Sequence, residues 1–232
     1  GPTGVDGIEI SVLPDATAIL AALRTGQFDF ALLNDPLIAT LVPNEAKLQL
    51  NRAPVLAYHV LQLNPARKPM NELAVRQAIS CAVDRQAVLD TASLGEGRVT
   101  GPLTMPYYAS DPNSLFCYAR DVEKELNVYV DTWLKGDFDM AVALNGGRPD
   151  PFTMYNRYWT KSGNLQKVSN FADDTLDALL QQGRAETNPE KRKAIFADFE
   201  KQLAEKSPWI WLYTSYGYTA QQKSVQGFVA MP

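Results

Sequence analysis

The first forty residues alternate between apolar and polar positions in a way that predicts a strand, a helix and a second strand. Ile8 to Val12 has apolar residues at every second position, the period of a half-buried strand. Asp15 is a favourable N-cap for the following helix, and Gly26 stands where a helix-terminating glycine is expected. Phe28 to Leu33 is then a short apolar strand, and Pro36 to Leu41 a weaker helical stretch. A strand–helix–strand order of this kind favours parallel pairing.

The middle of the chain predicts one strand, one long helix and a long loop. Val55 to Leu63 alternates again and indicates a strand. Asn71 is a candidate cap for a helix over about 72–91, whose apolar residues recur at helical spacing. A glycine- and proline-rich loop over 95–106 follows. In the stretch 111–134, a helical pattern passes into a strand pattern with no turn between them.

The last hundred residues continue the alternation of strands and helices. Phe138 to Leu144 predicts a strand, and Asp174 to Gln182 predicts a helix. Asn188-Pro189 places a cap and an N1 proline before another helix. Trp209 to Thr214 is an apolar strand, and we expect the tail from Tyr216 to Val229 to be extended. The whole order predicts an α/β protein with a largely parallel or mixed sheet.

Composition narrows the classes of function. The chain has 232 residues, of which 46% are hydrophobic and 21% charged, as in an ordinary globular protein. A net charge of −4 and the absence of a basic run argue against a nucleic-acid partner. No apolar run is long enough to span a membrane, and no signal peptide pattern is present. The start Gly1-Pro2-Thr3-Gly4 is not a natural initiator, so we expect a processed or engineered chain.

Cysteine and histidine are scarce. Cys81 and Cys117 could form one disulfide, which the sequence leaves open, although the helical setting of Cys81 favours a free thiol packed as a small hydrophobe. The single histidine, His59, excludes a histidine-rich metal site and would have to carry any Ser-His-Asp triad alone. We therefore expect no metal and no cofactor.

Several segments, taken in order, resemble the family 5 extracytoplasmic solute-binding proteins of ABC transporters, which include peptide, nickel, glutathione and opine binders. Each motif alone is weak, but together they cover nearly the whole chain. The segments are Asp6-Gly7-Ile8, Leu23-Arg24-Thr25-Gly26-Gln27-Phe28-Asp29, Leu63-Asn64, Val75-Arg76-Gln77-Ala78-Ile79, Val83-Asp84-Arg85, Gly136-Asp137-Phe138-Asp139-Met140, Asp150-Pro151, Leu176-Asp177-Ala178-Leu179-Leu180, the single residue Arg192, Pro208-Trp209-Ile210-Trp211-Leu212-Tyr213 and Val225-Gln226-Gly227-Phe228.

The resemblance implies an α/β fold like that of type II periplasmic binding proteins, with two lobes joined by hinge strands and an incomplete first lobe. Residues 1–62 would be part of lobe 1, 63–210 lobe 2, and 211–232 the return to lobe 1. Family members are about twice as long as this chain. We expect segments to be missing before the start, after Asp121-Val122-Glu123-Lys124 and after Trp133.

The same resemblance makes the strands near Val55 to Leu63 and Trp209 to Tyr216 carry the chain between the lobes. Tyr58, Tyr213 and Tyr216 on those strands would line a ligand cleft, unless they pack in either core. Three more aromatic residues are candidates for a cleft wall, which suits sugars and flat polar ligands, or for core positions. They are Tyr108, Tyr155 and Trp159.

The loop that begins at Asn145 is the best candidate site, because it follows the end of a predicted strand. Gly147 would let the backbone approach a ligand, and Arg148 would either clamp a carboxylate or be a solvated loop charge. Asp150 more often structures a turn before proline than binds a ligand. In the peptide binders, an acidic residue three positions before the Asp-Pro pair grips the peptide's amino terminus. Gly147 stands there, which disfavours a generic peptide and leaves sugars and opine-like molecules open.

These observations predict the substrate-binding component of an ABC importer that captures a small polar molecule such as a peptide, opine or sugar. It would be an exported, periplasmic or cell-surface monomer that delivers ligand to the permease subunits and is not an enzyme. One alternative is a truncated lobe that folds but has lost ligand binding. The other is a hydrolase, against which the chain lacks a Gly-x-Ser-x-Gly elbow, a His-x-x-x-His pair and a phosphate-binding loop.

Overall fold

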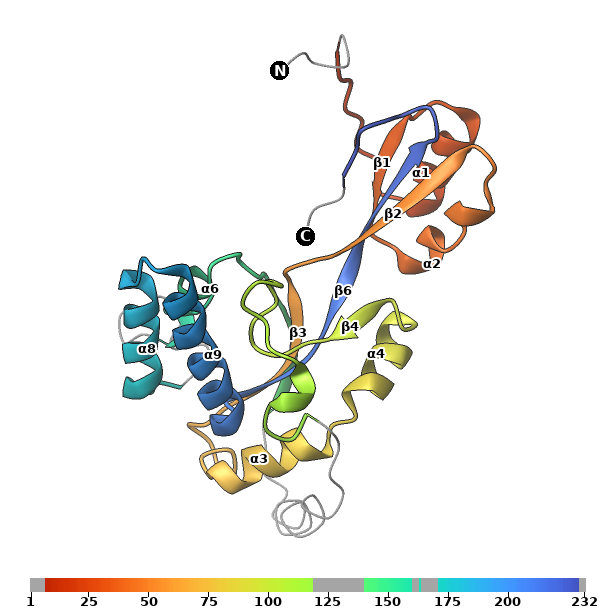
Figure 1. The fold of residues 1–232 in the computed structure, drawn as a ribbon. Coiled ribbons are helices and arrows are strands. Elements are labelled where there is room, and N and C mark those ends of the chain that lie inside the picture. The colour runs from red at the N-terminus through yellow and green to blue at the C-terminus, as the bar shows by residue number, and fades with distance from the viewer. Residues whose placement is uncertain (1–6, 119–139, 160–162, 164–170, 230–232) are drawn as a thin grey trace. The chain divides into compact units, whose positions relative to one another are not determined.

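The computed structural model describes residues 7–118, 140–159, 163 and 171–229 (Figure 1). The chain divides into two compact units. The small unit combines Gly1–Ala53 with Gly217–Met231, and the large unit is Pro54–Tyr216. How these units correspond to the lobes expected over 1–62, 63–210 and 211–232 stays a prediction. The expected joins after residues 124 and 133 lie outside the described residues.

The small unit is built from three strands and short helices. Helix α1 (Ala16–Thr25) leads into β1 (Phe30–Leu33), and α2 (Pro36–Ala39) and a short 3-10 turn (Val42–Asn44) lead into β2 (Leu48–Pro54). The last strand of the chain, β6 (Trp209–Gln222), completes this sheet by pairing with both β1 and β2. The predicted caps of α1 are confirmed. Asp15 Oδ1 accepts a hydrogen bond from the Ala18 N–H at 2.7 Å, and Gly26 is left-handed with φ 76°.

The expected parallel pairing in this region is wrong. Residues Ile8 to Val12 form no strand, and β1 instead pairs antiparallel with β6, with Phe30 opposite Gln221 and Leu33 opposite Tyr218. The alternating pattern of Ile8 to Val12 therefore has no sheet beside it in the described structure. The partner of β1 comes from the far end of the sequence, which a local strand–helix–strand pattern does not reveal.

The large unit has a second sheet, whose strands run in the order β4, β6, β3, β5. Strand β3 (Tyr58–Leu63) lies between β5 (Met140–Asn145) and β6, and β4 (Gly97–Val99) pairs with the other edge of β6. Every pairing whose register the structure describes is antiparallel. The expected α/β class is confirmed, while the expectation of a largely parallel sheet fails for these pairings.

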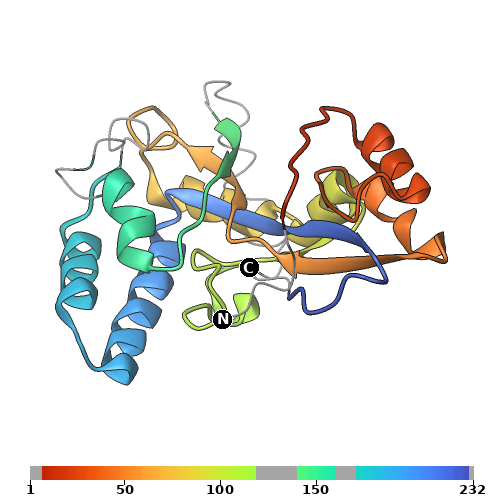
Figure 2. The same ribbon diagram turned by 90° about the horizontal axis from the view of Figure 1, so that it is seen from above.

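Helices surround this second sheet. Among the described residues the other helices are α3 (Leu73–Ala82), α4 (Arg85–Ser93), a short 3-10 turn (Pro112–Ser114), α6 (Pro151–Trp159), α8 (Asp174–Ala185) and α9 (Pro189–Lys206). Helices α8 and α9 lie side by side in both views (Figure 2). The predicted cap of α9 is confirmed, because Asn188 Oδ1 accepts from the Lys191 N–H at 3.0 Å.

The long helix expected over 72–91 is two helices. Val83 is extended, with φ −73° and ψ 114°, and ends α3. Asp84 then caps α4 by accepting from the Ala87 N–H at 2.9 Å. The expectation that Asn71 caps the first helix is also wrong, because the N-cap position is Glu72, which makes no side-chain cap bond.

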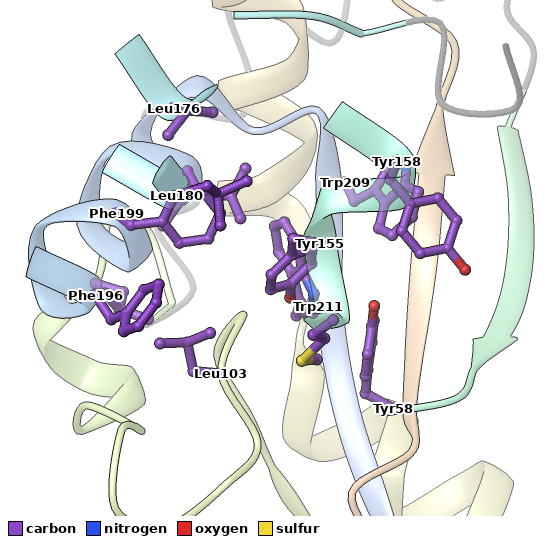
Figure 3. Packing of buried hydrophobic residues seen from close by; sticks show 14 of the residues in the cluster. Tyr58, Leu103, Tyr155, Tyr158, Leu176, Leu180, Phe196, Phe199, Trp209 and Trp211 are labelled. Atoms are coloured by element: carbon purple, nitrogen blue, oxygen red, sulfur yellow. The ribbon is translucent and has the colours of Figure 1, made fainter. Parts of the chain in front are cut away.

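An aromatic core joins the sheet of the large unit to its helices. Figure 3 shows Trp209 and Trp211 on β6, Tyr155 and Tyr158 on α6, and Phe196 and Phe199 on α9 converging in one cluster. Ring centroids of Tyr158 and Trp209 lie 5.0 Å apart, and those of Tyr155 and Phe199 5.5 Å apart. This core holds α6, and with it the end of the loop that precedes α6.

Cys81 and Cys117 form a disulfide, with their Cα atoms 4.6 Å apart. Cys81 is buried as expected, but the free-thiol interpretation is wrong. The bond ties the end of α3 to the segment that follows Pro112–Ser114. Sequence spacing alone could not decide this, because pairing depends on whether the fold brings two Cα atoms within bonding range.

Candidate functional site: the loop between β5 and α6

The loop Asn145–Asp150, here called the β5–α6 loop, connects a paired strand to a packed helix. At its start, Asn145 is the register partner of Tyr58 on β3. At its end, Pro151 begins α6, whose Tyr155 is fully buried. Both ends of the loop are therefore held by the structured part of the large unit, which limits how far its middle residues can move.

Both carboxylate oxygens of Asp150 are engaged in contacts within the fold. Its Oδ1 accepts from the Thr153 N–H at 3.1 Å, and its backbone carbonyl accepts from the Thr153 hydroxyl at 2.9 Å. Its other carboxylate oxygen forms an ion pair with the guanidinium of Arg192. This arrangement supports the interpretation that Asp150 structures the start of α6.

Arg192 on α9, which belongs to the residues that carry the family resemblance but has no role predicted from the sequence, is a contact point of this region. Besides Asp150, it donates to the Tyr108 hydroxyl and, through Nε, to the Gly183 carbonyl oxygen at 2.8 Å. Tyr108 also packs edge-on against Phe196, with ring centroids 5.4 Å apart. One guanidinium thus joins α9, the end of α8, the loop that carries Tyr108 and the start of α6. Partial burial raises the pKa of Tyr108 above its ordinary value, although Arg192 opposes that rise.

Gly147 is a glycine because the backbone of another segment passes very close to it. A Cβ at this position would lie 1.7 Å from the carbonyl oxygen of Leu56. That same oxygen accepts from the Thr104 hydroxyl at 2.7 Å, so it cannot easily move away. Gly147 therefore permits the loop to pack against the segment before β3, whereas a Cβ on Gly146 would meet nothing within 4 Å.

The loop and α6 carry polar donors that no acceptor satisfies among the described residues. Asn145 is 8% exposed, and its Oδ1 accepts from the Tyr158 hydroxyl at 3.4 Å, while its Nδ2 is buried with no acceptor. Arg157 lies over the Tyr158 ring and donates at 3.5 Å to the Gly146 carbonyl, but its Nε is buried with no acceptor. Arg148 is exposed, and no acidic residue of the described chain pairs with it.

The candidate tyrosines divide between core and partly exposed positions. Tyr58 and Tyr155 are fully buried, and Tyr155 donates its hydroxyl proton to the Pro102 carbonyl oxygen. Burial raises the pKa of both phenols far above the ordinary value for tyrosine. Both therefore belong to the hydrophobic core of the large unit, with their hydroxyls away from water.

Three further aromatic candidates are Tyr213, Tyr216 and Trp159. Tyr213 is also buried, in a second hydrophobic cluster of the large unit, and it stacks on the imidazole of His59, with ring centroids 4.3 Å apart. Burial lowers the pKa of His59 below its ordinary value. Tyr216 is half-buried on β6. Trp159 is the last residue of α6, and its side chain lies outside the described part of the chain.

A buried carboxylate, also missed from the sequence, holds the loop that carries Tyr108. Glu200 on α9 is 0% exposed and accepts hydrogen bonds from the backbone N–H groups of Leu103 at 3.2 Å and Ser110 at 3.0 Å. Burial raises the pKa of Glu200, although these hydrogen bonds counteract the rise. An acidic residue on an acid-rich helix looks solvated in the sequence, so only the fold could identify this role.

A separate hollow of about 410 Å³ opens beside α4, away from the β5–α6 loop. It is lined by Asp84, Arg85, Gln86, Val99, Pro112, Asn113 and Tyr118. Its cation, Arg85, already uses four of its five N–H donors, since it donates to the carbonyl oxygens of Trp211, Ser80 and Cys117 and to the Ser80 hydroxyl. With most of this donor group occupied, this hollow is a weaker candidate than the loop.

Within the described residues, no cluster of three or more histidine, cysteine or acidic side chains could hold a metal ion. The helices of the described part are also either too short or too polar to cross a bilayer.

The chain is similar to known proteins along its whole length. A family model for bacterial extracellular solute-binding proteins, family 5, matches residues 1–125. A probable di/tripeptide-binding protein 5 of Pseudomonas aeruginosa (strain UCBPP-PA14) is 23% identical over 288 residues, which cover 100% of this chain and 54% of that protein. Heme-binding protein A of Haemophilus influenzae is 22% identical, with 100% and 53% covered. The aligned stretch is longer than the chain itself, so these relatives carry internal segments that this chain lacks.

Solved structures show the same fold. The structure of HbpA2 from Haemophilus parasuis superposes with a TM-score of 0.80 at 20% identity, covering 94% of this chain and 54% of that one. AgaA from A. tumefaciens R10, in complex with agropinic acid, gives 0.71 at 23% identity, covering 94% and 55%. The fold is that of type II periplasmic binding proteins, as expected. The chain spans about half the length of the relatives it matches, and with a family model matching more than half of its residues, it belongs to the family 5 bacterial extracellular solute-binding proteins.

Proposed function

We propose that this chain is the substrate-binding part of an ABC importer, and that it captures a small polar solute outside the cytoplasm for delivery to the permease subunits. The observation that carries this proposal is family membership, because the family model matches residues 1–125. The curated relatives are named as binders of peptides, heme and nickel. We further propose that the chain acts as a monomer and without catalysing a reaction on its ligand.

The β5–α6 loop is the part of the large unit that best supports ligand binding. Its position between a paired strand and a packed helix preorganises the backbone, which lowers the entropic cost of binding. We propose that Asn145, Gly147 and Arg148 contact the ligand, that Asp150 and Tyr108 position the loop, and that Tyr58 and Tyr155 form the wall behind it. Tyr213, Tyr216 and Trp159 stay candidates for the same site.

A second candidate function rests on the length of the chain. The chain spans about half the length of the relatives that it matches, so the second candidate is a lobe that folds but binds no ligand by itself. A hydrolase has less support, since the single histidine stacks on Tyr213 and titrates below its ordinary pKa because of burial.

A thermal-denaturation screen separates these candidates. Ligand that binds the native state alone stabilises it by about 2.7 kcal/mol when present at a hundred times its Kd. We therefore expect a clear rise in Tm with at least one member of a panel of peptides, sugars, opine-like acids and nickel. A folded chain, verified by circular dichroism, that no member of the panel stabilises would favour the non-binding lobe. Turnover of an ester or peptide would favour the hydrolase.

A further inference from the structure

The β5–α6 loop and the start of α6 carry more hydrogen-bond donors than acceptors. Two donor atoms are buried without an acceptor among the described residues, Asn145 Nδ2 and Arg157 Nε. Asn145 is more than nine-tenths buried, which makes the missing acceptor for its Nδ2 costly. A third donor group, the guanidinium of Arg148, projects from the same loop and is exposed.

This region also has more positive than negative charge. Between Asn145 and Trp159 the charged residues are Arg148, Asp150 and Arg157. Asp150 is neutralised by Arg192, and its second oxygen caps α6. Neither Arg148 nor Arg157 has an acidic partner within the described chain. Two uncompensated guanidinium groups therefore stand at one loop, the exposed one at Arg148 and the other beside the Gly146 carbonyl.

We propose that the β5–α6 loop binds a carboxylate group, so that the solute of this protein is a small organic acid in which no free ammonium group faces this loop. The proposal deepens the proposed function and rests on it. Arg148 pairs with the carboxylate through its planar fork of N–H donors, which fits the two carboxylate oxygens. Arg157, on the first helix after the loop, adds a second positive charge, and the amide of Asn145 supplies a neutral donor.

A ligand that carries an ammonium group does not fit this set of hydrogen-bond donors and positive charges. An ammonium group needs acceptors, and both oxygens of the only carboxylate on the loop are already engaged. Burying an ammonium beside two guanidinium groups would add like-charge repulsion to that deficit. A neutral sugar could use the donors but would leave both charges unpaired. A phosphate shares the chemistry of a carboxylate toward guanidinium, so the experiment has to distinguish the two.

Packing makes Arg148 the right residue to test. It is exposed, so its substitution removes charge and donors without opening a cavity, whereas Arg157 also covers the Tyr158 ring. Gly147 is unsuitable as a test position, because any side chain there would overlap the Leu56 carbonyl. Arg67, an arginine in the turn before α3 that matches Arg148 in residue type and exposure, provides a control for Arg148→Gln.

The test is isothermal titration calorimetry of the 232-residue chain with a matched panel. The panel contains small mono- and dicarboxylic acids, the carboxamide of each acid, alanyl-alaninamide as an ammonium ligand without a carboxylate, glucose, and glycerol phosphate. We expect at least one acid to bind and its carboxamide to bind about ten- to a hundredfold more weakly, the factor for losing a charge-assisted hydrogen-bonded pair. Arg148→Gln should cause a loss of the same size, and Arg67→Gln should leave the Kd unchanged.

Each other outcome counts against a defined claim. If glucose, alanyl-alaninamide or glycerol phosphate binds and no acid does, the carboxylate inference is overturned while the proposed function stands. If an acid binds and Arg148→Gln binds it equally well, the β5–α6 loop is not where its carboxylate is held, and the inference again fails. If the folded chain binds no member of the panel, both the inference and the proposed function are contradicted.

Discussion

The two units of this protein differ in how completely they bury their apolar side chains. In the large unit, the aromatic side chains of β6, α6 and α9 are enclosed, and even the charged Arg85 and Glu200 are buried with hydrogen-bond partners. In the small unit, three apolar side chains of the segment before α1 are more than four-fifths exposed, and Leu32 on β1 is 64% exposed. Those three are Ile8, Ile10 and Val12. Apolar exposure at this density marks a surface that another segment or molecule normally covers.

This difference indicates which unit contributes most to the free energy of unfolding and which unit exposes apolar surface. The chain spans about half of the relatives that it matches. The large unit nevertheless has a closed core, a disulfide and a network of buried hydrogen bonds. We therefore expect the large unit to dominate the free energy of unfolding and the small unit to dominate solubility. Three experiments can break or sharpen this contrast.

The largest effect is expected in the core of the large unit. Phe199→Ala removes a fully buried ring that packs against Tyr155, and it should lower the free energy of unfolding by about 3–5 kcal/mol. Urea denaturation followed by tryptophan fluorescence measures this directly, because Trp209 and Trp211 lie in the same cluster. A loss below about 1 kcal/mol would mean that this core is loosely packed in solution.

A smaller, pH-dependent effect is expected at Glu200. Burial raises its pKa in the folded state, so folding favours the protonated form, and its contribution to stability is largest below the unfolded pKa, about 4.3. That contribution is lost as the pH rises through the raised pKa of the folded protein. Glu200→Gln does not titrate and presents an amide donor to one of the two backbone N–H groups. The wild type should be more stable than this variant by about 1 kcal/mol near pH 4, with a smaller advantage at pH 7.

The ionisable groups that face Glu200 do not disturb the comparison between the wild type and Glu200→Gln. The ionisable side chains that interact with it, Tyr118 and Tyr155, have pKa values raised by their own burial and stay neutral over this range. Other titrating groups are common to both proteins, so they cancel when the stabilities of wild type and variant are subtracted. An advantage of the wild type that grew between pH 4 and pH 7 would show that the folded pKa is lowered instead.

The smallest change in stability is expected in the small unit. The triple substitution Ile8→Ser, Ile10→Ser and Val12→Ser should change the free energy of unfolding by less than about 0.5 kcal/mol, because all three side chains are exposed. It should, however, reduce binding of an apolar dye and concentration-dependent association. Leu20→Ser on α1 is the control, since that side chain is 1% exposed and its loss should be strongly destabilising. If the triple variant were as unstable as the control, the segment would be buried in solution.

Only part of the candidate site could be predicted from the pattern of residues in the sequence. The position of the loop after a strand and the turn-forming tendency of Asp150 could be identified from residue types. That Gly147 lets the backbone approach a ligand stays a prediction, whereas the structure shows its backbone against the Leu56 carbonyl. The roles of Arg192 and Glu200 could not be identified, because an arginine and a glutamate on a polar helix carry no signal of burial in the sequence. Their roles arise from contacts with Asp150, Tyr108, Leu103 and Ser110, which lie dozens of residues away.

What the sequence by itself determined are the features governed by neighbours in the chain. The caps at Asp15, Gly26 and Asn188, and the family resemblance carried by ordered short motifs, depend on contacts within a few residues or on residue identity alone. Only the tertiary structure decided that β6 pairs antiparallel with β1 and β3, that Cys81 bonds to Cys117, and that the long helix breaks at Val83. These outcomes depend on which distant segments meet. The free energy of such contacts is a property of the packed fold and not of any local stretch of residues.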